Sequence, residues 1–341
     1  MATPGLDTMT GVQISTVDGH VAGGAVRLVV AGAPAVVAGS LADRSQALVE
    51  ALGFAAAGLG REPRGHAGTT VVLLAEPDRD VADAGMIFLH DGELVPLCGQ
   101  ALIGATALAL DRRLVVPRQP GSVELDTLAG PVRARWTAAG GRAARVAYAG
   151  PPSSVLRPNY PIAIGRRELR ADLVWTGAEL VAILDAEAAG VPLVAVRALE
   201  VQRAGRQVIA HLDDVVRVPN PLTGSIVSVA TAVFIGASPE QGADVRSGSV
   251  HRDGAVDRSP GGGATVAIAT VLTAMGMLAP GGTMMHQGLA GTSLRAEVTE
   301  VGERDGVPMV TVEVEGECWP TGDHTFTFHP DDPLIEGYVW T

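Results

Sequence analysis

The stretch "SPGGGATVAIATVL", residues 259–272, places a polar turn and three consecutive glycines directly before an apolar segment of helical length. It can be laid over "LCGQALIGATALAL", residues 97–110, so that Gly261 stands opposite Cys98. Both segments follow residues typical of a hairpin and a strand. The order of hairpin, strand, glycine and helix thus occurs once in each half of the chain. This repeat predicts two similar lobes.

The remaining segments favour an α+β fold. Strand-like runs cover 11–18 and 25–34, and the apolar spacing predicts helices over 41–59 and within 191–205. We expect a first lobe over 1–150, joined by about 325–341, and a second lobe over 151–324 that carries the 257–263 loop. Proline and small polar residues around 150–161 are typical of the crossing between lobes. The active site is expected in the cleft between the two facing helix N-termini.

Composition excludes several classes of protein. The formal net charge of −12 argues against nucleic acid or an anionic membrane as the main partner. No apolar run approaches the roughly 20 residues of a membrane-spanning helix. The start "MATPGLDTMTGVQ" has neither a basic nor a hydrophobic segment, so a cytoplasmic protein is expected.

The chain has no lysine, because all 25 residues in the Lys+Arg count are arginine. This excludes a Schiff-base lysine and the lysine of a phosphate-binding loop. Its two cysteines, Cys98 and Cys318, cannot form a disulfide framework, and no Cys-x-x-Cys or His-Glu-x-x-His spacing suggests zinc.

The two predicted helix starts suit a small anion. Backbone N–H groups at a helix N-terminus lack internal partners, and the helix dipole adds positive potential. The same field would lower the pKa of Cys98 and supply a thiolate that removes a weakly acidic Cα proton. The alternative is that Cys98 is a small core residue in front of an apolar helix.

Six stretches carry a resemblance to a known family: "VDGHVAGGAVRLVVAGAP" at 17–34, "REPRGH" at 61–66, "PLCGQ" at 96–100, "VDRSPGGGAT" at 256–265, "GLAGTSLRAEV" at 288–298 and "TGDHTFTFHPDDPLIEGY" at 321–338. Along nearly its whole length the chain resembles the proline racemase family, which shares the two-lobed fold of diaminopimelate epimerase. The resemblance implies cofactor-free chemistry, in which two cysteines on opposite sides of the substrate Cα exchange its proton.

The resemblance assigns roles to individual residues. Cys98 matches the first base. Gly99, Gly262 and Gly263 match positions whose backbone amides bind the substrate carboxylate. Asp257 matches the aspartate that holds the ring nitrogen, and the alternative is a turn or helix-cap carboxylate.

The second base is missing, because Gly261 stands where the family has cysteine, or threonine in the trans-3-hydroxyproline dehydratases. One base is enough to eliminate a β-hydroxyl after Cα deprotonation, which yields an enamine and then a cyclic imine. We therefore expect a lyase that dehydrates trans-3-hydroxy-L-proline or a close analogue. The proton for the leaving hydroxyl could come from the Cys98 thiol, from His251 or from water in the space left by Gly261.

Further departures point to a polar substrate ring. Gln100 replaces the family's histidine beside the first base and cannot titrate. His251 and Thr70 are polar where proline-specific members tend to be apolar, although His251 is equally compatible with an exposed turn.

Residues further from these motifs are interpreted more simply. Val71, Ala264 and Gly261 would enlarge or reshape the pocket. Cys318 matches no catalytic position and is expected to be a buried structural thiol. His20 fits either the cleft or a structural strand end.

Two other functions stay open. One is a hydroxyproline 2-epimerase or proline racemase-like isomerase, with water or His251 as second proton donor. The other is a catalytically silent protein that binds proline analogues. The expected partner is a small amino acid, with no cofactor or metal, and the family makes a homodimer possible.

Overall fold

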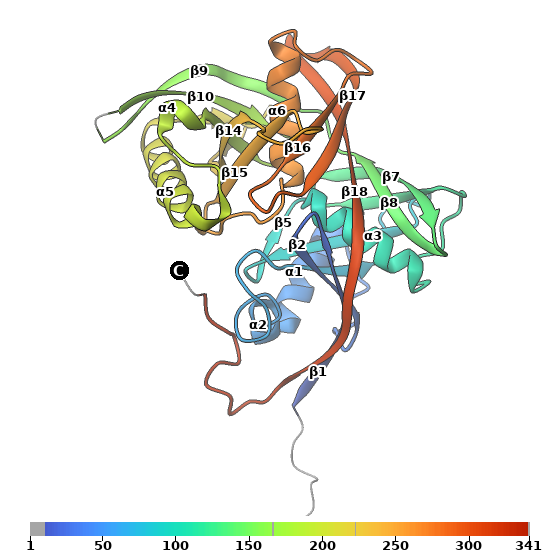
Figure 1. Cartoon of the computed structure of the whole chain (residues 1–341). Helices are drawn as coiled ribbons and strands as arrows, with labels where there is room; N and C mark the ends of the chain where they lie inside the picture. The colour runs from blue at the N-terminus through green and yellow to red at the C-terminus, as the bar shows by residue number, and fades with distance from the viewer. Residues whose placement is uncertain (1–10, 166, 222, 340–341) are drawn as a thin grey trace, which may run out of the picture.

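The computed structural model describes residues 11–165, 167–221 and 223–339. Its first lobe (Figure 1) contains β1 Val12–Val21, β2 Gly24–Ala31, α1 Leu41–Leu52, α2 Phe54–Gly58, β3 Thr70–Ala75, β4 Ala84–His90, β5 Glu93–Val95, α3 Gly99–Asp111, β6 Ser122–Thr127, β7 Gly130–Ala139 and β8 Arg142–Ala149. The strands follow the order β1-β2-β3-β4-β6-β7-β8-β18, and β18 pairs again with β1. The first lobe is thus a sheet closed on itself.

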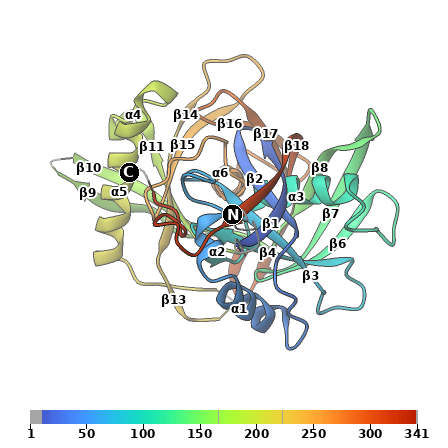
Figure 2. The same cartoon turned by 90° about the horizontal axis from the view of Figure 1, so that it is seen from below.

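The second lobe repeats this plan with β9 Ser154–Ile164, β10 Arg167–Trp175, β11 Leu180–Asp185, α4 Ala186–Ala189, the 3-10 turn η1 Ala195–Arg197, α5 Ala198–Val215, β12 Val218–Pro219, β13 Ile226–Val227, β14 Val229–Ala237, β15 Val245–His251, α6 Gly262–Ala274, β16 Thr283–Gln287, β17 Ser293–Arg304 and β18 Val307–Phe328. Its order is β18-β17-β16-β15-β14-β11-β10-β9, and a bridge between Ser153 and Val310 brings the start of β9 back to β18. In Figure 2, α4 and α5 lie at one side of the molecule and β6–β8 at the other.

One central helix fills each lobe. Residues 99–109 of α3 are all buried, and α6 is buried at 262 and over 264–271. A helix that is apolar on every face must lie inside the core, and both helices share one large hydrophobic cluster. Each helix connects two parallel strands, β4 with β6 and β15 with β16. The predicted α+β fold with two similar lobes is therefore confirmed.

The strand β18 joins the two lobes. It pairs with β17 over 307–315, with β8 over 313–317 and with β1 over 318–328. Figure 1 shows this strand running from the second lobe into the first. The predicted lobe boundaries remain predictions.

Two predicted helices differ from the structure. The helix expected over 41–59 is broken at Gly53, whose φ of +53° interrupts the helical path between α1 and α2. The helix expected within 191–205 begins only at Ala198 and continues to Val215, because its buried positions recur with helical spacing as far as Leu212.

None of the helices in the described ranges is both long and apolar enough to cross a bilayer.

Candidate active site

The starts of α3 and α6 face each other where the lobes meet. Cys98 precedes the first turn of α3 and Gly261 precedes that of α6, as the alignment of the two segments predicts. A Cβ atom on Gly262 would lie 2.9 Å from the Cα atom of Gly99 and 3.1 Å from the backbone nitrogen of Gln100. The helix starts thus come within backbone contact, which glycine permits. Their free N–H groups and the positive ends of both dipoles converge on one small volume that suits a carboxylate.

A cavity of about 440 Å³ lies beside the two helix starts, with walls from both lobes. The eight site residues predicted from the sequence all line it: Cys98, Gly99, Gln100, His251, Asp257, Gly261, Gly262 and Gly263. Thr70 and Ala264 line it too. Its size suits a ligand as small as a cyclic amino acid.

Cys98 is half-buried at the start of α3, with its Sγ atom 3.6 Å from the Thr70 Oγ1 atom. The pKa of its thiol is raised to about 11, chiefly by burial and also by the charges of Asp257 and Glu179, while hydrogen bonds from Thr70 and the Ala101 backbone lower it. The helix start does lower this pKa, through the Ala101 backbone N–H, but the expected net lowering is wrong. Loss of solvent and two nearby acids outweigh the helix field.

On the α6 side of the cavity, position 261 has no side chain and lies beside the Asp257 carboxylate. Gly261 adopts a φ of +78°, in the region that disfavours residues with a side chain. A Cβ atom there would lie 2.8 Å from the Oδ2 atom of Asp257. A side chain at position 261 would therefore press against the Asp257 carboxylate.

His251 links Asp257 to a group that the sequence did not reveal. Its Nε2 atom lies 3.0 Å from the Asp257 Oδ2 atom, and its Nδ1 atom 3.2 Å from the Thr231 Oγ1 atom. Burial alone would lower the pKa of His251, but Asp257, Glu179 and Asp253 raise it to about 9. The ring is therefore protonated at neutral pH, and it is not a free turn histidine.

Glu179 and Thr231 complete this network. The Thr231 hydroxyl donates a hydrogen bond of 3.0 Å to the Glu179 Oε2 atom. Glu179 stands directly before an apolar strand, and Thr231 lies inside another. Nothing in the sequence around either residue indicates a functional site. Only the neighbouring positions of β11 and β14 in the sheet bring them together.

Gln100 connects the two helix starts. Its side-chain oxygen accepts a hydrogen bond from the Ser259 hydroxyl, which in turn accepts one from the Gly261 backbone nitrogen. The side chain is 4% exposed. The amide that replaces the family's histidine therefore ties the α3 start to the α6 loop.

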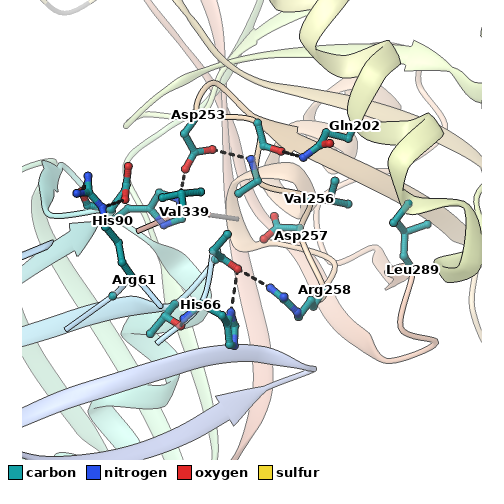
Figure 3. Close-up of a pocket in the computed structure, with 18 of the residues that line it drawn as sticks. Arg61, His66, His90, Gln202, Asp253, Val256, Asp257, Arg258, Leu289 and Val339 are labelled. Carbon is teal, nitrogen blue, oxygen red and sulfur yellow. Dashed lines mark hydrogen bonds and ion pairs between the residues drawn. The ribbon is translucent and has the colours of Figure 1, made fainter. Parts of the chain in front are cut away.

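A second hollow of about 350 Å³ adjoins the cavity and shares Asp257, His90 and Asp253 with it. Figure 3 shows Asp253 of the second lobe reaching His90 of the first, where Oδ2 and Nε2 are 2.9 Å apart. Arg258 of the second lobe donates a hydrogen bond of 2.5 Å to the Ala67 carbonyl of the first. These contacts hold the lobes together along the edge of the cavity.

Three residues lie away from the cavity. Cys318 is buried in β18, as predicted, and burial raises the pKa of its thiol to about 12. Val71 is buried in the core against α1, so the expectation that it shapes the pocket is wrong. His20, on β1, accepts a hydrogen bond of 3.4 Å from the Gly23 backbone and does not line the cavity.

Across the described part of the chain, no group of three or more His, Cys, Asp or Glu side chains is arranged to hold a metal ion.

Comparisons with known proteins point to one family. A trans-3-hydroxy-L-proline dehydratase of Bacillus cereus is 27% identical over 326 residues, or 95% of this chain and 97% of that protein. A 4-hydroxyproline 2-epimerase of Brucella anthropi is 27% identical over 328 residues, with the same coverage. The crystal structure of a hydroxyproline epimerase from Agrobacterium vitis with bound trans-4-OH-L-proline superimposes with a TM-score of 0.86 at 25% identity, covering 96% of this chain and 95% of that one.

A protein of the phenazine biosynthesis PhzF family from Bacillus anthracis shares the fold, with a TM-score of 0.59 at 10% identity over 92% of this chain and 99% of that one. The family model of proline racemase matches residues 16–339. With the cavity between two helix starts, this match shows that the chain belongs to the proline racemase family of enzymes.

Proposed function

We propose that the enzyme is a cofactor-independent lyase that dehydrates trans-3-hydroxy-L-proline or a close analogue, with Cys98 as its single base. The observation that carries this proposal is the α6 side of the cavity. Gly261 has a positive φ and no side chain, and a Cβ atom there would lie 2.8 Å from the Asp257 Oδ2 atom. A thiol is thus present on one side of the substrate only, which suits elimination better than proton exchange between two thiols.

The reaction balances with one thiol. The Cys98 thiolate takes the Cα proton, and the electron pair of that bond forms the Cα=Cβ bond while the Cβ–O bond breaks. The leaving hydroxide takes a proton and departs as water. The enamine product then tautomerises to a cyclic imine.

Substrate binding lowers the raised pKa of the Cys98 thiol. Asp257 helps to raise the pKa of the thiol, and the positive ring nitrogen of an amino acid beside Asp257 offsets its charge. The thiolate therefore forms more readily in the complex. The amides at the two helix starts bind the substrate carboxylate and stabilise the negative charge that grows on it.

Epimerisation of a hydroxyproline is the second candidate. It is supported by the relative named 4-hydroxyproline 2-epimerase, which is as similar as the dehydratase. His251, protonated at neutral pH on the α6 side, offers a proton source away from Cys98. That the enzyme works in the cytoplasm and as a homodimer stays a prediction.

Proton NMR in deuterated water distinguishes these functions when trans-3-hydroxy-L-proline, trans-4-hydroxy-L-proline and L-proline are offered separately. We expect only the 3-hydroxy substrate to disappear, into an imine. Cys98→Ser should lower the rate of conversion by about 10²–10⁴-fold, because a serine hydroxyl is a far weaker base than a thiolate.

Deuterium at Cα together with a new diastereomer would instead establish the epimerase. Binding of all three compounds, seen as a rise in Tm without any exchange at Cα, would indicate a silent binding protein.

A further inference from the structure

Glu179 is a carboxyl group in the cavity wall that has no counterpart among the residues assigned from the family. Its backbone is held by a tight turn, in which the Thr176 nitrogen donates to the Glu179 carbonyl at 3.0 Å and the Glu179 nitrogen donates to the Thr176 hydroxyl at 3.2 Å. The turn joins β10 to β11 and directs the side chain toward the first turn of α6. Position 179 is therefore set by rigid sheet structure.

The Glu179 carboxyl packs directly against the start of α6. A Cβ atom on Gly263 would overlap its Oε1 atom, so that glycine leaves the room that the carboxyl occupies. Gly263 also lines the cavity between the lobes. Glu179 thus belongs to the second-lobe wall, whereas Cys98 belongs to the first.

The other carboxyl oxygen ends a continuous hydrogen-bond chain. Thr231 has one hydroxyl proton and donates it to Glu179 at 3.0 Å, so it accepts from the His251 Nδ1–H at 3.2 Å. With Nδ1 a donor, the protonated His251 also donates Nε2–H to Asp257 at 3.0 Å. This chain can carry a proton from His251 to Glu179 through a hydroxyl.

The surroundings favour the protonated form of Glu179 more than water would. Burial raises the pKa of its carboxyl, the Asp257 charge raises it further, and His251 and Thr231 oppose the rise. A carboxylate bound by the α6 amides would lie close to Glu179 and favour its neutral form, because like charges repel. A protonated carboxyl group is a stronger acid than the Cys98 thiol or water.

We propose that Glu179 is the general acid of the reaction, which gives its proton to the leaving hydroxyl and regains one through Thr231 and His251. This assignment rests on the proposed dehydration. The Cα–H bond breaks toward Cys98, the Cβ–O bond breaks, and the Glu179 O–H bond is exchanged for an O–H bond of the released water. The proton held by Cys98 returns to the network through solvent, so the enzyme ends in its starting state.

A pair of substrates separates this role from binding or folding. Chloride leaves without a proton, whereas hydroxide needs one, so of 3-chloroproline and 3-hydroxyproline only the second needs an acid. We expect Glu179→Gln to lower kcat for 3-hydroxyproline by about 10²–10⁴-fold while kcat for 3-chloroproline changes less than about threefold. Both diastereomers of each compound are offered, because they present the leaving group to opposite faces of the ring.

Glu187→Gln, the same substitution at an exposed position of α4, is the matched control and should affect neither substrate. Thr231→Val, which removes the hydroxyl link, should slow the hydroxy substrate selectively and less severely. Tm values establish that the variants fold.

If Glu179→Gln slows both substrates equally, or neither, the assignment of the acid is wrong. If wild-type enzyme eliminates chloride but converts no 3-hydroxyproline, the proposed dehydration fails and the acid with it. If wild-type enzyme acts on neither compound, deprotonation by Cys98 fails as well.

Discussion

His251 is held between a carboxylate and a hydroxyl, and its proton contributes to stability. Burial would lower its pKa, but Asp257 and Glu179 raise it from an ordinary 6.5 to about 9. Because the folded-state pKa lies above the ordinary one, the stabilisation is complete below pH 6.5 and is lost as the pH rises through about 9. The protonated ring thus connects the stability of the fold to the same network that surrounds the cavity.

We expect the free energy of unfolding to fall more steeply with pH in wild-type enzyme than in His251→Gln. The difference between the two proteins should shrink by at most about 3 kcal/mol from about pH 6 to about pH 9.5, since one pKa unit corresponds to about 1.4 kcal/mol. Urea unfolding at a series of pH values measures this. Parallel curves would mean that His251 titrates alike in folded and unfolded chains.

At the scale of elements, the starts of α3 and α6 define the site. Each helix is buried over most of its length and is fixed by its own lobe, so the distance between their first turns is set by how the lobes meet. The backbone of Gly262 touches that of Gly99, and the Tyr148 hydroxyl lies beside both glycines. A carboxylate site made of backbone groups depends on this approach.

Gly262→Ala tests the approach. Alanine is favoured over glycine in a helix by about 1 kcal/mol, but here its Cβ atom meets the backbone of Gly99 at 2.9 Å. We therefore expect a loss of about 1–3 kcal/mol in stability and a large rise in KM, as the helix starts are forced apart.

Chemical denaturation and steady-state kinetics measure both effects. Gly302→Ala, where a Cβ atom meets no other atom within 4 Å, is the control and should change neither. A Gly262→Ala enzyme as stable and active as wild type would show that the helix starts are not in tight contact.

At the scale of the whole molecule, the strands of both lobes form one sheet through β18, and polar contacts join the lobes near the cavity. The His90–Asp253 pair is one such contact, between the end of β4 and the turn after β15. Burial would raise the pKa of Asp253, but His90 and the Ala255 backbone lower it to about 2. The aspartate therefore stays charged throughout the working range of pH.

His90→Ala should loosen this rim without unfolding the protein. The side chains are 20% and 32% exposed, so the pair contributes about 0–1 kcal/mol to stability and Tm should change little. We expect KM to rise a few-fold, because the lobes close less firmly around the substrate. His329→Ala, at an ion pair of 3.8 Å outside the cavity lining, is the control. An unchanged KM would mean that β18 and the hydrophobic cores hold the two lobes in place without help from this pair.

Much of this protein follows from local pattern. The two apolar segments with their preceding glycines predicted the central helices to within a few residues, because a helix that is apolar on all sides can only be central. Motifs around Cys98 and Asp257 identified the family. They also predicted eight site residues, all of which line one cavity. Local pattern was less reliable at Gly53 and at the start of α5, where one backbone angle and a few turn residues decide the boundary.

Sequence alone determined the family, the two-lobed fold, the missing second thiol at Gly261 and the position of Cys98 before α3, because each depends on residues close together in the chain. Tertiary structure decided the pKa values of the side chains around the cavity and which residues they contact. Glu179 and Thr231 are 52 residues apart, and His90 and Asp253 are 163 apart. The raised pKa of Cys98 comes from burial and from acids in the other lobe. Burial and charge depend on distances through space, which no short stretch of sequence contains.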